Sequence, residues 1–364
     1  MRVKLEDVCE RGSSNLKQSD VVDMEGDYPI YGASGYISNV DFYHQENPYV
    51  AVVKDGAGIG RTTLHPAKSS VIGTMQYLLP KDNVLPEYLY YVVSYMHLEK
   101  YFTGATIPHI YFKDYKNEEF NLDSLDKQKE IVDVLGKCEA VIELRKKELL
   151  LLDEFIKARF VEMFGDPVVN EKGWLTKPLL DMGQCKNGMN FHYDDEGVEI
   201  NCLGVGDFKD LSIIDNTDKL PIVSLNEMPS EEYLLKDDDI VFVRSNGNKA
   251  LVGRSIAVYP GDVPTTFSGF CIRYRKHDNE ITVPYLLRVL KADSMRGKMT
   301  GRGANIQNLN QQILGTLVIP VPPMELQEQF ADFVKQVDKS KVAVQKALDE
   351  TQLLFDSLMQ KYFG

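Results

Sequence analysis

An internal repeat without gaps constrains this chain more strongly than any other feature of its sequence. Residues 104–165 align with residues 303–364 at a constant offset, so that Gln128 matches Gln327, 199 positions later. Both aligned segments end in Phe-Gly. The other identical positions, given for the first copy, are Gly104, Ala105, Ile107, Asp133, Lys147 and Leu149. We therefore expect two copies of one structural unit, related by a pseudo-twofold axis.

Each copy is predicted to end in a long amphipathic helix. Residues 125–163 and 324–363 carry apolar residues at alternating intervals of three and four, which is the period of one helix face. Pro322 and Pro323 precede the second segment, at a place where a helix start tolerates proline. Two helices with one-sided apolar stripes bury those stripes most simply against each other. The sequence therefore predicts an antiparallel coiled coil.

The segments before the two helices are mixed in character and rich in predicted strands. Residues 49–53 and 239–243 have the β-branched and aromatic composition of strands. The offset between the copies drifts in these segments, so their length differences are confined to them. The predicted fold class is α+β. Its four parts, a strand-rich module, a helix, a second module and a second helix, are residues 1–124, 125–164, 165–323 and 324–364.

Composition excludes several classes of protein. The sequence contains no run of about 18 apolar residues, so no membrane span is expected, and its N-terminal segment lacks the apolar core of a secretory signal. The five cysteines are scattered without a CxxC pair, which argues against a disulfide framework or structural zinc and for a reducing cytoplasm. A net charge of −13 disfavours non-specific binding to nucleic acid, but it permits a local basic surface.

A glycine-rich turn follows the first strand run. Gly56, Gly58 and Gly60 alternate as they do in dinucleotide-binding and S-adenosylmethionine-binding folds, where such a turn opens a helix. Residues 61–66 contain β-branched and turn-forming residues and end in proline, so no helix is expected there. The second copy lacks the glycine pattern. We therefore interpret the segment as a tight turn between strands, and we expect no cofactor in this chain.

Other catalytic patterns are incomplete. Asn47-Pro48-Tyr49 lacks the second proline of the NPPY motif that amino-methyltransferases use. The carboxylates near Asp166 are not predicted to lie on neighbouring strands, as a nuclease would require. The six histidines have no metal-ligand spacing, and no Ser-His-Asp arrangement stands out. We therefore expect a chain without a catalytic or metal site.

Basic and amide side chains collect instead in loops that match between the copies. In the major groove arginine pairs with guanine, and asparagine or glutamine pairs with adenine, while lysine and arginine bind phosphates. The predicted DNA-binding residues of the first copy are Lys54, Arg61, Thr106, His109 and Lys113. Those of the second copy are Arg244, Asn246, Lys249, Arg254, Arg302, Asn305, Gln307 and Asn308. For the two clusters together, DNA binding is favoured over ordinary solvated loops.

The order of several segments resembles the specificity subunits of type I restriction-modification systems. Residues 303–310 match the asparagine-leucine loop of that family, and residues 317–330 match its strand, double proline and Gln-containing helix start. The first copy is degenerate, because His109-Ile110 replaces Asn-Leu and residues 122–125 lack the prolines. Residues 28–32 resemble a further family segment. The resemblance covers essentially the whole chain and rests on the order of these segments.

The resemblance implies two target recognition domains, each reading one half of an interrupted DNA sequence, with the helices setting the gap between them. It implies no catalysis by this chain. Two modification subunits would methylate adenine N6 with S-adenosylmethionine, and two restriction subunits would add ATP-driven translocation and cleavage. The expected partners are therefore double-stranded DNA and these subunits, in the cytoplasm and away from membranes.

Two other functions stay open at this point. One is an adaptor that does not bind DNA and joins two protein-binding modules through a coiled coil. The other is an autonomous methyltransferase built on residues 56–60. A purified chain that binds S-adenosylmethionine would favour the methyltransferase, whereas a complex that shifts no duplex in a gel would favour the adaptor.

Overall fold

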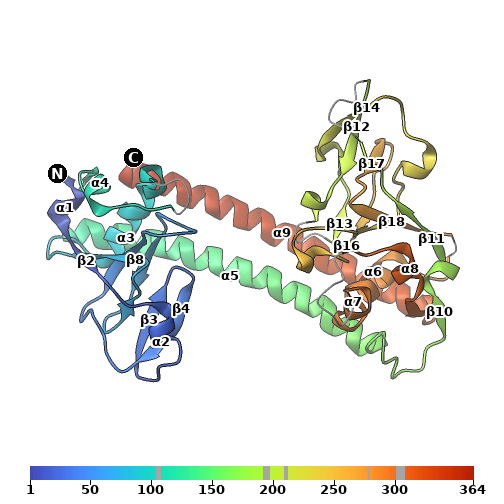
Figure 1. Cartoon of the computed structure of the whole chain (residues 1–364), viewed down its shortest axis with the longest axis horizontal. Coiled ribbons are helices and arrows are strands. Elements are labelled where there is room, and N and C mark those ends of the chain that lie inside the picture. The colour runs from blue at the N-terminus through green and yellow to red at the C-terminus, as the bar shows by residue number, and fades with distance from the viewer. Residues whose placement is uncertain (104–107, 192–196, 209–211, 278, 301–307) are drawn as a thin grey trace. The chain divides into compact units, whose positions relative to one another are not determined.

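The computed structural model of the chain describes residues 1–103, 108–191, 197–208, 212–277, 279–300 and 308–364 (Figure 1). The contacts divide it into two compact units. Unit 1 consists of Met1–Lys147 and Val344–Gly364, and unit 2 consists of Glu148–Ala343. Both boundaries fall inside the long helices rather than at their ends. Each unit therefore contains one strand-rich module together with a part of each helix, because each module packs on both helices.

Two 40-residue helices confirm the helices predicted from the apolar period (Figure 1). Helix α5 spans Leu125–Phe164 and helix α9 spans Met324–Phe363. The shorter helices of unit 1 are α1 (Leu5–Val8), α2 (Gln18–Val21), α3 (Pro86–Tyr95) and α4 (Phe112–Tyr115). Those of unit 2 are α6 (Val283–Lys291), α7 (Asp293–Thr300) and α8 (Gln311–Gly315). Both α3 and α6 begin with a proline in their first two positions, where its missing N–H has no helical partner to lose.

The long helices are antiparallel within each unit. In unit 1, Leu135 near the start of α5 shares an apolar cluster with Met359 near the end of α9. In unit 2, Phe160 near the end of α5 packs edge-on against Phe330 near the start of α9, with 5.5 Å between the ring centroids. The apolar stripes thus meet as the sequence predicts.

The module of unit 1 contains two main sheets. Its strands are β1 (Arg2–Lys4), β2 (Cys9–Ser13), β3 (Tyr28–Gly32), β4 (Gly35–Val40), β5 (Tyr49–Val53), β6 (Thr62–His65), β7 (Ser70–Val71), β8 (Met75–Pro80) and β9 (Glu119–Asn121). One sheet has the order β2-β8-β5-β6 and is antiparallel throughout. The other has the order β4-β3-β7, in which β3 and β7 are parallel. Strands β1 and β9 form a separate antiparallel pair.

The module of unit 2 repeats this topology and adds one strand. Its strands are β10 (Thr176–Pro178), β11 (Gly183–Asn187), β12 (Val198–Leu203), β13 (Ile213–Ile214), β14 (Ile222–Leu225), β15 (Asp239–Val243), β16 (Ser255–Val258), β17 (Thr265–Phe267), β18 (Cys271–Lys276) and β19 (Val318–Pro320). The sheets have the orders β11-β18-β15-β16-β13 and β14-β12-β17, and β10 pairs with β19. The parallel pair recurs between β12 and β17. The internal repeat is therefore a repeat of topology.

The central strands β5 and β15 are buried at all five of their positions because both faces of their sheets are covered. Val50 and Val52 face the cluster formed with α3 and α5, whereas Ala51 lies in the cluster on the opposite face. In unit 2, Phe242 faces the helices and Val243 faces the second sheet. Successive side chains of a strand point to opposite faces, so a continuous apolar run fits a strand covered on both sides.

A buried glutamine joins α5 to the module of unit 1. The amide nitrogen of Gln128 donates hydrogen bonds to the carbonyl oxygens of Asn83 (3.0 Å) and Asp123 (2.9 Å). Its amide oxygen accepts a hydrogen bond of 2.9 Å from the N–H of Leu85. The residue is fully buried. Three bonds from one side chain therefore satisfy buried backbone groups on two loops and fix the helix start between them.

Gln327 makes the same three bonds at the start of α9. Its amide nitrogen donates to the carbonyl oxygens of Glu280 (3.0 Å) and Pro322 (2.9 Å). Its amide oxygen accepts a hydrogen bond of 2.9 Å from the N–H of Thr282. This side chain is also fully buried. The identity of Gln128 and Gln327 in the repeat thus marks one structural role in both units.

Candidate nucleic-acid interface

The turns that leave β5 and β15 are closed by the same backbone hydrogen bonds. Val53 donates its N–H to the carbonyl oxygen of Arg61 and accepts from the N–H of Gly60, both at 2.9 Å. Val243 makes the equivalent pair with residues 253–254, again at 2.9 Å. Gly60 has a φ of +82°, which glycine adopts without strain. Strand β6 follows directly, so the prediction of a tight turn between strands is confirmed.

Substitution of Gly60 by alanine should destabilise unit 1. A Cβ atom there would lie 2.5 Å from the backbone nitrogen of Glu99, on a backbone with positive φ. We expect Gly60→Ala to lower the free energy of unfolding by about 2 kcal/mol. Gly56→Ala is the matched control, because Gly56 has a φ of +84° but no atom within 4 Å of the added Cβ. Urea unfolding followed by circular dichroism measures both, and equal losses would contradict a role for the close approach.

A second segment, much later in the chain, joins each turn. In unit 1 the N–H of Ile110 donates to the carbonyl oxygen of Lys54 at 3.0 Å. In unit 2 the N–H of Leu309 donates to the carbonyl oxygen of Arg244 at 2.8 Å. Ile110 and Leu309 are equivalent in the repeat. The fold therefore brings together predicted site residues that lie more than fifty positions apart in the sequence.

In unit 1 an acidic residue that the sequence analysis missed organises the site. The Nδ1 atom of His109 lies 2.6 Å from Oδ1 of Asp55, and Nζ of Lys54 lies 3.9 Å from Oδ2 of the same carboxylate. A carboxylate only accepts hydrogen bonds, so Nδ1 carries a proton, and Nε2 can accept when the ring is neutral. The signal for Asp55 was its position beside Lys54 in the glycine turn.

The other predicted residues of unit 1 lie on either side of this group. The Arg61 guanidinium donates to the carbonyl oxygen of Ala33. Nζ of Lys113 lies 5.2 Å from the ring centroid of Tyr111, a cation–π distance. The Tyr111 ring stacks on the His109 ring, with 6.4 Å between centroids. Thr106 lies outside the described residues.

In unit 2 the predicted residues line the corresponding turn. Nη1 of Arg244 donates to the carbonyl oxygen of Gly269 at 3.1 Å. Oδ1 of Asn246 accepts a hydrogen bond of 2.7 Å from the N–H of Asn248, which shapes the turn. Ser245 forms a β-bridge with Asn308, so Asn308 is held beside Arg244 and Asn246.

Arg254 stands at the other end of this turn, where Nη1 donates to the carbonyl oxygen of Phe208 at 3.4 Å. The predicted residues Arg302, Asn305 and Gln307 fall outside the described part of the chain, as does the side chain of Lys249. The two modules thus present polar side chains at three equivalent positions. The equivalent pairs are Lys54 with Arg244, Arg61 with Arg254, and His109 with Asn308.

The described residues give little sign of metal or thiol chemistry. In this part of the chain no group of three or more His, Cys, Asp or Glu side chains is placed to hold a metal ion. All five cysteines are free. Burial raises the pKa of Cys9, Cys185 and Cys202 to about 12, and a thiol with such a pKa is a poor nucleophile. Among the helices described, none is long and apolar enough to cross a membrane.

The chain is thus a protein of two modules with one topology, each with polar side chains at the same three positions. The family model described as "type I restriction modification DNA specificity domain" matches residues 1–153 and 171–351. The chain therefore belongs to this family. Its members are the DNA-recognition components of type I restriction-modification systems and are not catalytic, so the chain is a DNA-recognition subunit rather than an enzyme. The resemblance in the sequence is confirmed.

Individual relatives agree with this assignment. The chain is 31% identical over 207 residues to the type I restriction enzyme StySPI specificity subunit of Salmonella potsdam, a match that spans 52% of this chain and 42% of that relative. It is 23% identical over 366 aligned positions to the MjaVIII specificity subunit of Methanocaldococcus jannaschii, spanning 89% and 84% of the two chains.

Two solved structures share the fold. The S subunit of a type I restriction-modification system from M. genitalium aligns with a TM-score of 0.61 and 16% identity, covering 100% of this chain and 96% of that one. A chain from a structure on complex assembly and conformational transition of the type I R-M system aligns with a TM-score of 0.55 and 14% identity, covering 100% and 97%. The predicted α+β fold with two long helices is thereby confirmed.

Proposed function

We propose that the chain reads an asymmetric, bipartite target on double-stranded DNA and positions methyltransferase subunits on it. The observation that carries this proposal is that the modules present different residues at equivalent backbone positions. Lys54 stands where the other module has Arg244, and His109 stands where it has Asn308. These side chains pair with different bases or with phosphates, so the two half-sites are expected to differ in sequence.

The proposed contacts follow from the chemistry of each side chain. Arg244 suits guanine, because a guanidinium can donate to both O6 and N7, and Asn246 suits adenine. Lys54 suits a backbone phosphate, since a lysine ammonium acts as a point charge. His109, held by Asp55, would offer Nε2 as an acceptor to a base donor.

The proposed protein partners are two modification subunits and two restriction subunits. The modification subunits would bind S-adenosylmethionine and the restriction subunits ATP, so the chain itself would need no cofactor. The net charge of −13 is compatible with such an assembly, because partner subunits can supply further cations to the DNA backbone. We propose the cytoplasm as the compartment, where host and invading DNA are within reach.

Methylome sequencing of cells with and without this chain tests the proposal. We expect one interrupted, asymmetric motif methylated at adenine N6, which disappears when the chain is deleted. A methylome that does not depend on the chain would contradict DNA recognition and favour the adaptor without DNA. Binding of S-adenosylmethionine by the purified chain would favour the autonomous methyltransferase instead.

Arg244→Ala should weaken binding to the target duplex and relax the sequence of the second half-site only. Loss of one bidentate base contact costs about 1–3 kcal/mol, which is a loss of affinity of about 5-fold to 150-fold. The exposed Lys219 offers the control Lys219→Ala in the same module. Fluorescence anisotropy measures the affinity and methylome sequencing the motif. An unchanged motif and affinity in Arg244→Ala would remove this residue from the interface.

A further inference from the structure

A crevice in unit 2 gathers four cationic side chains. It has a volume of about 340 Å³ and lies between α5, the start of β16, the end of α6 and α7. Arg254, Arg288, Lys291 and Arg296 line it, and Asp153 is the one carboxylate among its described lining residues. Such an excess of positive charge is unusual in a chain with a net charge of −13. The charge of this lining therefore favours an anion over a cation in the crevice.

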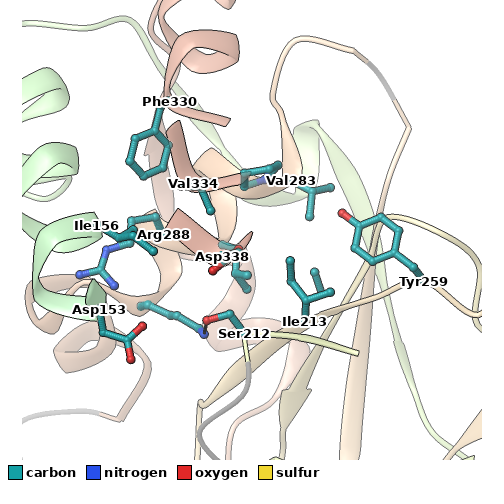
Figure 2. A pocket seen from close by; sticks show the side chains of 14 residues that line it. Asp153, Ile156, Ser212, Ile213, Tyr259, Val283, Arg288, Phe330, Val334 and Asp338 are labelled. Carbon is teal, nitrogen blue, oxygen red and sulfur yellow. Dashed lines mark hydrogen bonds between the residues drawn. The ribbon is translucent and has the colours of Figure 1, made fainter. Parts of the chain in front are cut away.

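A smaller hollow of about 70 Å³ borders this crevice and shares Asp153, Ser212, Arg288 and Lys291 with it. Figure 2 shows the polar side chains of Asp153, Arg288 and Ser212 on one side of the hollow, away from Tyr259. The polar end of the hollow thus adjoins the crevice. Arg288 stands at the junction of the two spaces.

One donor in the crevice is unsatisfied, and one of its cations has no ion pair. Ser255 is 3% exposed, and its hydroxyl makes no hydrogen bond to any described atom. The half-buried guanidinium of Arg288 forms no ion pair with a described carboxylate, although Glu154, Asp153 and Asp293 are near enough to act on its pKa. A buried donor without a partner is costly, and native proteins rarely leave one without a reason.

The charges in the crevice also repel one another. Burial and, next, the neighbouring Arg288 charge together lower the pKa of Lys291 to about 8. Nζ of Lys291 donates to Oγ of Ser212 at 2.8 Å, which is a neutral partner. Burial likewise lowers the pKa of Arg296, and the positive charge of Arg254 adds to this lowering. An anion among these groups would relieve both effects.

The fold itself does not require these cations. Strands and helices of the two units are equivalent, and at the offset of 197 that relates α3 to α6, Arg288 and Lys291 replace Tyr91 and Ser94. In unit 1 the Tyr91 hydroxyl donates to Glu139 of α5 at 2.7 Å, so the shared fold accepts a neutral side chain at this position. The repeat itself therefore does not require the two cations of unit 2.

We propose that the crevice binds a phosphate group of the DNA backbone beside the second half-site. Arg288 and Ser255 donate hydrogen bonds to its oxygens, and Lys291 adds positive charge. DNA is the favoured source of the phosphate because Arg254, in the same crevice, closes the turn that begins at Arg244. A guanidinium matches phosphate oxygens in a bidentate geometry. This inference rests on the proposed function.

A scan with methylphosphonate linkages tests the inference in the assembled complex. In the wild type, neutralising one phosphate beside the second half-site should lower affinity about tenfold. In Arg288→Gln the charged duplex should already bind about tenfold more weakly, and neutralising that phosphate should have no further effect. The slope of log affinity against log salt should fall by about one, with the methylated bases unchanged. Lys335→Gln, at an exposed site on α9, should keep the wild-type pattern.

Several outcomes would overturn the inference. One is a scan in which every linkage has the same effect in the wild type and in Arg288→Gln. In another, inorganic phosphate protects the wild-type chain from unfolding but does not protect Arg288→Gln, and no single linkage in the scan depends on Arg288. That result would assign the crevice to free phosphate. Weakened binding of the modification subunits with an unchanged scan would assign it to an acidic protein partner. Lys291→Gln replaces Arg288→Gln if that variant does not fold. A wild-type complex without any methylated target would instead contradict the proposed function.

Discussion

Asp239→Asn should lower the free energy of unfolding of unit 2 by about 3–4 kcal/mol, because it removes the charge from a buried ion pair. Asp239 is fully buried, and its carboxylate accepts hydrogen bonds of 2.7 Å from both Nε and Nη2 of Arg275. Arg273 lies on β18, as Arg275 does. It is 2% exposed, and its Nε and Nη1 have no partner among the described residues. The Asp239 charge acts on this second guanidinium as well. Without it, Arg275 would lose its ion pair, and Arg273 would lose the larger of the two carboxylate charges that act on it.

The single tryptophan of the chain makes this measurement specific to unit 2. Trp174 lies in unit 2, and its indole N–H donates to the carbonyl oxygen of Phe164 at 3.0 Å. Its fluorescence during urea unfolding therefore follows this unit. Asp262→Asn, at an exposed carboxylate, is the matched control. A midpoint for Asp239→Asn equal to that of the control would contradict the ion-pair argument, whereas adding Arg275→Gln should restore part of the loss.

Gln327→Ala should cost about 2–3 kcal/mol of stability in unit 2. The substitution leaves the N–H of Thr282 and the carbonyl oxygens of Glu280 and Pro322 without partners inside the protein. Each buried group without a partner costs about 1–3 kcal/mol, and water entering the space left by the side chain offsets part of the sum. Gln336→Ala, at an exposed position on α9 within unit 2, should cost far less.

The repeat supplies an internal comparison for this prediction. Gln128→Ala should destabilise unit 1 to a similar extent, since Gln128 makes the same three hydrogen bonds. Circular dichroism should detect the loss in both variants, but tryptophan fluorescence should respond only to Gln327→Ala. If both substitutions behaved like Gln336→Ala, the buried glutamines would not hold the helix starts. If Gln128→Ala shifted the Trp174 transition equally, the two units would not unfold independently.

Much of the fold could be predicted because its signals are local. The apolar period of residues 125–163 specifies a helix face wherever the segment lies, and α5 has the predicted start. The runs at 49–53 and 239–243 became β5 and β15 with the predicted bounds. Their order in the sheets could not be predicted, because strand pairing depends on contacts between distant segments that no local pattern encodes.

The candidate site likewise has a part that the sequence predicts and a part that it does not. The glycine turn was predictable, because β-branched residues after Gly60 disfavour a helix. The pairing of His109 with Asp55 was not, since these residues lie 54 positions apart and meet only when the later segment joins the turn. The three hydrogen bonds of Gln327 could not be predicted from the sequence either, although the sequence does show that Gln327 is identical to Gln128 in the repeat.

The sequence by itself determined the repeat, the two helices, the central strands and the family, because each depends on periodicity or on the order of segments along the chain. Only the tertiary structure decided which polar residues share a site. Arg288 and Lys291 look like the solvated face of a short helix, and Ser255 looks like an ordinary strand residue. They line one crevice because α6 packs across the start of β16, and the burial produced by that packing is what makes unpaired donors and charges informative.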